Sequence, residues 1–134
     1  MVGVLYVANL IVKQQNQIFE PEGLNAQKFN ALRILRGQYP NPASEKLIRE
    51  KLIDKTIDLP RMLHGLASTG FVDRIRNTRD KRVVDVIITA KGLKTLSSLD
   101  KVQNEITRST KLLSEEDAKQ LNEHLEKMLS ALVK

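Results

Sequence analysis

The fold is constrained most by one change of hydrophobic period, which lies between residues 71 and 89. On either side of this segment, apolar residues recur at helical spacing. Within it, FVDRI and VVDVIIT alternate as β-strands do, with Val84, Val86 and Ile88 on one face and Asp85 and Ile87 on the other. The loop between them, RNTRDK, is polar and rich in turn-forming residues. The sequence therefore predicts one β-hairpin in an otherwise helical chain.

Two helices are predicted at the start of the chain. Apolar residues at helical spacing run over residues 1–20, and Pro21 and Gly23 end that helix. Asn25 is a good N-cap for the second helix, which Gly37 is expected to close. The apolar start lacks a basic lead and is shorter than the roughly 20 residues of a membrane span. It therefore predicts neither a secretory signal nor a membrane helix.

Two further helices are predicted before the hairpin. Ser44 opens a short one, and the next begins between Asp54 and Asp58 and ends at Gly70. After the hairpin, helicity resumes near Thr89 and continues toward residue 113. Two consecutive helices followed by a β-hairpin make a helix-turn-helix with a wing. The predicted fold class is therefore mainly α (α+β), a winged helix-turn-helix between terminal helices.

The last predicted helix has an apolar seam. Ser114, with Asp117 three residues further on, resembles a capping box that starts this helix. The seam residues recur at intervals of three and four, as in a helix that packs on a partner helix. They are Ala118, Leu121, Leu125, Met128 and Leu132.

Composition narrows the class of function. A length of 134 residues favours one domain, and a net charge of +6 favours an anionic partner, either nucleic acid or a membrane surface. The positive charges gather on the hairpin and not along an amphipathic helix, which disfavours a membrane partner. The chain has no cysteine, which excludes a disulfide framework and a thiolate site and fits a cytoplasmic protein.

Signals for catalysis are weak. The sequence has no Gly-rich phosphate loop, nucleophile elbow or HExxH motif. It has only two histidines, and neither lies at ligand spacing from a carboxylate. We expect no enzyme activity, no cofactor and no metal site.

The hairpin also resembles the wing of the MarR family of winged-helix transcriptional regulators. The match is Asp80-x-Arg82-x-x-x-Val86-x-Ile88-Thr89-x-x-Gly92, with Ile in place of the usual Leu. Upstream, residues 47–74 resemble the two DNA-contacting helices of the family, and residues 29–38 resemble its second helix. Five residues fall at the expected intervals: Leu52, Arg61, Leu66, Gly70 and Val72.

The resemblance covers essentially the whole chain and implies an architecture. Residues 1–134 would form one MarR-like domain, with residues 25–92 as the DNA-binding winged helix. Residues 1–20 and 93–134 would be dimerisation helices, whose pairing in a homodimer buries the apolar N-terminus. The family usually represses transcription and releases its pseudo-palindromic DNA when a small molecule or an oxidant acts. Without cysteine, a thiol switch is excluded, which leaves a small-molecule effector that no residue identifies.

Expected roles differ among the candidate residues. Asp58 either caps its helix or accepts a hydrogen bond from a cytosine amino group. Arg61 either contacts phosphate or guanine, or lies solvated over the core. His64 either contacts the DNA groove or lies solvated. The resemblance implies that Asp80 orients the wing while a basic wing residue enters the minor groove. The candidate DNA-binding residues are Ser44, Lys46, Lys55, Thr56, Asp58, Arg61, His64, Arg76, Arg79, Asp80, Lys81 and Arg82.

One departure from the family concerns the recognition helix. Where many relatives carry Ser or Thr on its exposed face, this chain has Lys55, Ile57, Asp58 and Pro60. Two other functions therefore stay open. One is a winged helix used only for protein–protein contacts, and the other is a small-molecule-binding protein without DNA affinity.

Overall fold

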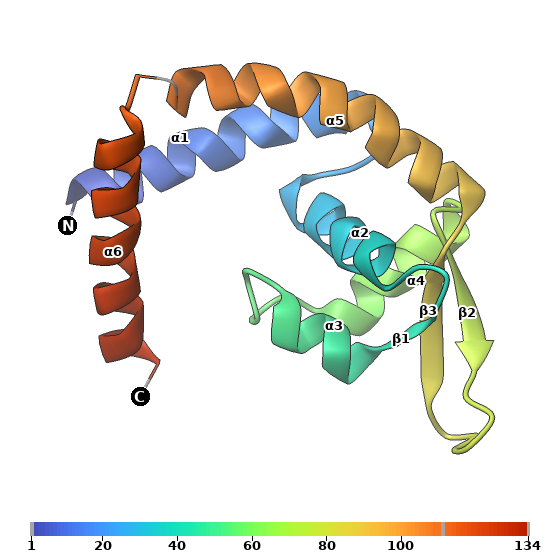
Figure 1. Cartoon of the computed structure of the whole chain (residues 1–134). Coiled ribbons are helices and arrows are strands. Elements are labelled where there is room, and N and C mark those ends of the chain that lie inside the picture. Colours follow the sequence, from blue (N-terminus) through green and yellow to red (C-terminus); the bar gives the residue numbers. More distant parts are fainter. Residues whose placement is uncertain (1, 111, 134) are drawn as a thin grey trace. The chain divides into compact units, whose positions relative to one another are not determined.

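The protein is mainly helical, with one small sheet. The computed structural model describes residues 2–110 and 112–133, with side chains for residues 2–102 and 112–133. The chain divides into two compact units, residues 1–100 and 101–134. The elements are α1 (Val2–Phe19), the 3-10 turn η1 (Glu20–Glu22), α2 (Ala26–Gln38), β1 (Ala43–Ser44), α3 (Glu45–Lys51), α4 (Leu59–Ser68), β2 (Val72–Arg76), β3 (Val84–Ile88), α5 (Ala90–Thr110) and α6 (Glu115–Leu132) (Figure 1). This order confirms the predicted fold class.

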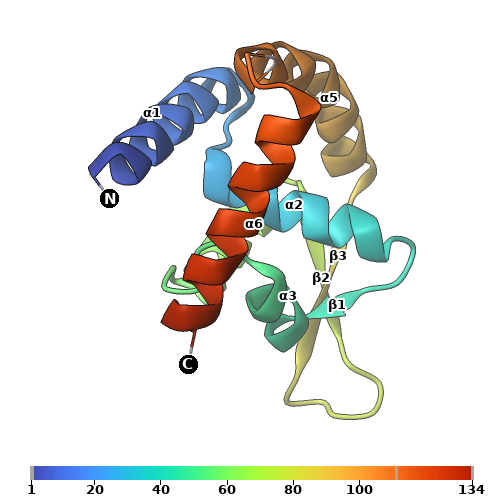
Figure 2. The same cartoon turned by 60° about the vertical axis from the view of Figure 1, so that its left-hand side comes forward.

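The sheet is antiparallel, with the strand order β1-β3-β2. Strands β2 and β3 form the predicted hairpin, in register from Val72 opposite Ile88 to Arg76 opposite Val84. Strand β1 was not expected from the sequence, because two residues are too short to show an alternating pattern. It pairs with β3 through Ala43 opposite Val86. The hairpin tip extends beyond helices α3 and α4 (Figures 1 and 2).

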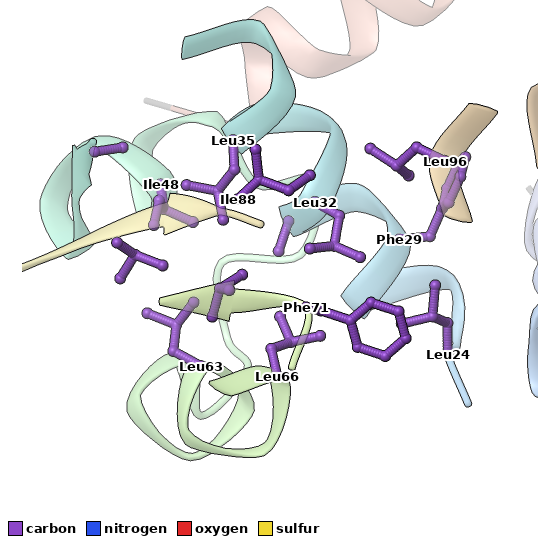
Figure 3. Packing of buried hydrophobic residues seen from close by; sticks show 14 of the residues in the cluster. Leu24, Phe29, Leu32, Leu35, Ile48, Leu63, Leu66, Phe71, Ile88 and Leu96 are labelled. Atoms are coloured by element: carbon purple, nitrogen blue, oxygen red, sulfur yellow. The ribbon is translucent and has the colours of Figure 1, made fainter. Parts of the chain in front are cut away.

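The core of the first unit lies between helices α2, α3 and α4 and the sheet (Figure 3). Each helix contributes aliphatic side chains at helical spacing, and the inner face of β3 contributes Val86 and Ile88. Phe19, at the end of α1, stacks on Phe29 of α2 with 4.3 Å between ring centroids. Each fully buried Leu, Ile or Phe stabilises the fold by about 1.5–3 kcal/mol. Completely buried side chains include Leu32, Leu35, Ile48, Leu59, Leu63, Leu66 and Leu96.

Most predicted helix ends agree with the structure, but Gly37 does not end α2. At its start, Asn25 Oδ1 accepts a hydrogen bond from the backbone N–H of Lys28, as expected of an N-cap. The helix continues past Gly37 to Gln38, and Tyr39 is the C-cap. The physical reason is the next residue: a residue before proline is disfavoured in helical geometry, so Tyr39 leaves the helix ahead of Pro40.

Two glycines have the left-handed backbone that ends a helix. Gly23 follows η1 with φ of 77°, and Gly70 follows α4 with φ of 84°. Both confirm the predicted ends of their helices, because glycine adopts this region without a Cβ clash. Helix α4 begins at Leu59, with Asp58 as its N-cap, within the predicted range.

The junction between β3 and α5 is tightly packed. The hydroxyl of Thr89 lies 2.6 Å from the carbonyl oxygen of Gly70 and accepts a hydrogen bond from the N–H of Gly92 at 3.2 Å. Lys91 Nζ donates to the carbonyl of Thr69 at 2.6 Å. A Cβ at Gly92 would lie 2.6 Å from both Ile88 Cγ1 and the Phe71 carbonyl oxygen. Only glycine fits there, which gives the last residue of the wing signature a packing reason.

A bidentate ion pair joins helix α2 to the last residue of the first unit. Arg36, in the last turn of α2, donates from Nη1 to Asp100 Oδ2 at 2.8 Å and from Nη2 to Oδ1 at 3.4 Å. Residues 90–100 of α5 are therefore fastened to the winged helix at both ends.

The second unit, residues 101–134, contains α6. Ser114 Oγ accepts from the N–H of Asp117 at 3.1 Å, which confirms the predicted cap. Along α6, the side chains of Leu121, Leu125 and Leu132 are exposed. In the first unit, apolar residues of α1 are exposed in the same way, namely Val2, Val4, Leu5, Tyr6, Val7, Leu10, Ile11 and Val12.

Candidate nucleic-acid interface

The loop at the hairpin tip, residues 77–83, is a closed turn. The N–H of Asn77 donates to the carbonyl of Val83 at 2.9 Å, and the N–H of Val83 donates to the carbonyl of Asp80 at 3.0 Å. The turn presents basic side chains to solvent, because Arg76, Arg79, Lys81 and Arg82 are all exposed. The structure therefore brings the five predicted wing residues, these four and Asp80, together at the hairpin tip.

Asp80 holds Arg82 by three hydrogen bonds. Its Oδ1 accepts from the backbone N–H of Arg82 at 3.0 Å and from Nε at 3.1 Å, and its Oδ2 accepts from Nη2 at 3.3 Å. The Arg82 guanidinium, and then its backbone amide, lower the pKa of Asp80. The side chain of Arg82 is otherwise 91% exposed. This geometry suits a carboxylate that orients the wing, the role expected for Asp80.

The start of α4 presents a second group of candidates. Asp58 Oδ1 accepts from the N–H of Arg61 at 3.2 Å, so the side chain of Asp58 caps the helix. The side chains of Arg61 and His64 are exposed. Their positions, one turn apart near the N-terminus of α4, are suitable for contacts to a phosphate or a base edge.

The prediction that Lys55 and Ile57 lie on the exposed face of this helix is wrong. Both precede α4, in the turn that follows α3, and Ile57 packs against the core. The physical reason is that Asp58 and Pro60 set the helix start, since Asp caps it and Pro is favoured in the first turn. Pro60 lies within α4, as expected.

The turn between α3 and α4 is organised by its own side chains. Thr56 donates from its hydroxyl to Asp54 Oδ1 at 2.6 Å and from its N–H to the same oxygen at 2.9 Å, and these bonds lower the pKa of Asp54. Arg49 Nη1 donates to the carbonyls of Lys55 and Ile57 at 3.2 and 3.4 Å. Lys55 Nζ in turn donates to the carbonyls of Arg49 and Glu50. Here Lys55 and Thr56 position the turn that leads into α4.

The remaining predicted residues lie at the start of α3. Ser44 Oγ accepts from the N–H of Leu47 at 3.1 Å, so Ser44 is a helix cap in this structure. Lys46, two residues on, is exposed. The candidates therefore fall into three groups, at the wing, at the start of α4 and at the start of α3 with the turn after it.

Three polar residues of these groups were not predicted. Arg49 supports the turn before α4, Arg74 is exposed on β2, and Asn77 bonds within the wing loop. For Asn77 a signal existed, because asparagine favours turns by accepting hydrogen bonds from nearby backbone amides. For Arg49 none did, since its partners depend on the path of the turn.

Metal-ligand clusters and membrane-spanning helices are absent from the described part of the chain. It contains no group of three or more histidines and carboxylates that could hold a metal ion. Among the same residues, no helix has the length and apolar character needed to cross a membrane.

Helices α2, α3 and α4 with the β2–β3 hairpin define a winged helix-turn-helix protein. No family model matches the chain, and no curated protein matches it in sequence. Solved structures do match over nearly its full length. A mutant MarR from E. coli complexed with operator DNA is 26% identical, with a TM-score of 0.82 over 94% of this chain and 90% of that one.

Two further solved structures agree. A MepR–DNA complex from S. aureus is 19% identical, with a TM-score of 0.87 over 98% of both chains. AbsC, a MarR-family regulator from Streptomyces coelicolor, is 21% identical, with a TM-score of 0.84 over 97% of this chain and 89% of that one. The chain is therefore a MarR-like winged-helix protein, which confirms the resemblance expected from the wing signature.

Proposed function

We propose that the protein is a sequence-specific transcriptional regulator that binds double-stranded DNA. In this proposal it binds a pseudo-palindromic operator as a homodimer, acts in the cytoplasm and represses transcription until a small molecule releases it. Each α4 lies in a major-groove half-site, and each wing lies in the flanking minor groove.

The observation that carries the proposal is the ordered, basic wing loop. Four exposed cationic side chains surround one carboxylate on a turn closed by backbone hydrogen bonds. A duplex neutralises such a cluster, and the narrow minor groove attracts arginine in particular. The E. coli MarR structure with operator DNA is a protein of this fold bound to the same class of partner.

The homodimer is supported by the exposed apolar residues of α1 and α6. A run such as Leu5, Tyr6 and Val7, each more than half exposed, is costly in water and typical of an association surface. Two copies would also place two winged helices on one duplex, which accounts for a pseudo-palindromic site.

Release by a small molecule is supported by the family resemblance. With no cysteine in the chain, oxidation of a thiol cannot serve as the switch. Reversal of DNA binding by a thiol reductant would contradict this part of the proposal.

Selection of bound sites from random duplex tests the function as a whole. We expect enrichment of a site with two related half-sites one helical turn apart. If no duplex is retained at low salt, the DNA-binding function is wrong, and a protein-interaction or small-molecule-binding module is favoured instead.

Substitutions in the wing test its part in binding. Arg82→Ala removes one cation from each protomer, and each lost phosphate contact lowers the slope of log K against log salt by about 0.9. We expect the slope for a dimer to fall by up to about 2.

Asp80→Ala removes a negative charge, yet we expect weaker DNA binding, because Arg82 loses its orienting partner. Tighter binding with an unchanged circular dichroism spectrum would contradict the role of Asp80.

A further inference from the structure

Asn77 is the first residue of the wing loop, and its side chain makes three hydrogen bonds. Its Oδ1 accepts from the N–H of Arg79 at 2.8 Å and from the N–H of Asp80 at 3.0 Å. Its Nδ2 donates to Asp85 Oδ2, on strand β3, at 2.9 Å. The side chain of Asn77 therefore links the first half of the loop, at Arg79 and Asp80, to strand β3.

These bonds act on the residues that carry the charges of the wing. Arg79 and Asp80 have their backbone amides fixed by Asn77, and Asp80 in turn fixes Arg82. Without Asn77 the two amides would lose their acceptor. The backbone that carries the Asp80–Arg82 pair would then no longer be held in place. An unordered wing would lose backbone conformational entropy when it binds, and this loss would weaken binding.

We propose that Asn77 is a positioning residue of the nucleic-acid interface. It carries no charge and pre-orders the wing, so that Arg79 and the Asp80–Arg82 pair meet the duplex in one conformation. The inference rests on the proposed function for its DNA-binding part, but the ordering of the loop is independent of any ligand.

The test compares Asn77→Ala with Thr78→Ala in the full chain. Thr78 is the adjacent residue, exposed in the same loop, and neither substitution changes the net charge. We expect Asn77→Ala to speed hydrogen exchange at the N–H groups of Arg79 and Asp80 in the free protein. The affinity for a mixed-sequence duplex should fall by about 5- to 30-fold for each wing that binds, the factor set by the ordering of one backbone residue. Thr78→Ala should change neither measurement by more than about twofold.

A double variant keeps the three hydrogen bonds and reverses only the one between positions 77 and 85. In Asn77→Asp with Asp85→Asn, the carboxylate at position 77 still accepts from both backbone amides, and the amide at position 85 donates back to it. Net charge is unchanged. We expect this variant to recover the exchange protection and the affinity to within about threefold of the original protein. Asn77→Asp alone places two carboxylates together and should not recover them.

The outcomes separate the inference from the proposed function. Unchanged exchange at Arg79 and Asp80 in Asn77→Ala overturns the positioning role, whatever the DNA result. Faster hydrogen exchange with unchanged DNA affinity also overturns the role of Asn77 in the nucleic-acid interface. If the original protein does not bind the duplex, the proposed function fails, and the interface role fails with it. Loss of affinity with faster exchange, restored in the double variant, supports it.

Discussion

At the scale of single residues, Gly92 shows how packing selects an amino acid. Its missing Cβ leaves room for Ile88 Cγ1 and the Phe71 carbonyl, each 2.6 Å from where that atom would lie. We expect Gly92→Ala to lower the free energy of unfolding by about 1–3 kcal/mol, because neither the buried Ile88 side chain nor the Phe71 carbonyl can move away cheaply. Urea unfolding followed by circular dichroism measures this.

Gly37 is the matched control. It also lies in a helix, but a Cβ there would meet nothing within 4 Å. Gly37→Ala should raise the free energy of unfolding by up to about 1 kcal/mol, since alanine is the better helix former. Equal losses in the two variants would show that Gly92 has no special packing role.

Asp80 gives a prediction about pH. The Arg82 side chain and backbone amide lower its pKa below the ordinary value of 3.8. Because the folded-state pKa is lower than the unfolded one, the contribution of Asp80 to stability is complete above the unfolded pKa. It is lost as pH falls through the folded pKa. Titration of the Asp80 carboxyl by NMR should give a lowered pKa that rises toward its ordinary value in Arg82→Ala. An equal pKa in both proteins would contradict the ion pair in solution.

At the scale of elements, helix α4 depends on its cap. Asp58→Ala removes the acceptor of the Arg61 N–H and should cost about 1 kcal/mol of stability. Asp58→Asn keeps an acceptor and should stay within a few tenths of a kcal/mol of the original protein. It also removes a negative charge beside Arg61, so DNA affinity should not fall. Thermal unfolding and a DNA titration of both variants check this, and weaker binding by Asp58→Asn would favour a direct base contact by the carboxylate.

Sequence patterns predict elements whose signals are local. The hairpin follows from alternation, and the starts of α2, α3, α4 and α6 follow from Asn25, Ser44, Asp58 and Ser114. Strand β1 leaves no local signal, because only its pairing with β3 makes it a strand. Gly37 gives a misleading signal, since a glycine at an exposed position of a helix is tolerated.

The candidate site divides in the same way. The basic loop can be located from the sequence, because its cluster of charges and the spacing of the wing signature are both local features. The bonds of Asn77, Arg49 and Lys55 depend on where the backbone of a turn runs, which no spacing rule specifies. Which residues touch DNA therefore stays a prediction, whereas the residues that hold the loops in place are read from the structure.

At the scale of the whole molecule, the exposed apolar residues of α1 predict an obligate association. Removing residues 1–12 would take away Val4, Leu5 and Ile11, which the proposed homodimer buries. We expect the original chain to sediment as a dimer at micromolar concentration and the shortened chain to give monomer or aggregate. A well-behaved monomer of the original chain would contradict the homodimer.

The packed junction at Thr89 has a mechanical consequence. Because Thr89, Lys91 and Gly92 all contact residues 69–71, the first turn of α5 cannot pivot about the end of β3. A rotation of residues 90–100 would therefore carry the hairpin with it and, through the Arg36–Asp100 ion pair, the end of α2. The five residues of β3 span roughly 17 Å, so turning its base by about 10° displaces its far end by about 3 Å. That displacement is close to the rise of one base pair, about 3.4 Å. A rotation of residues 90–100 by about 10° would therefore displace the far end of β3 by about one base-pair step.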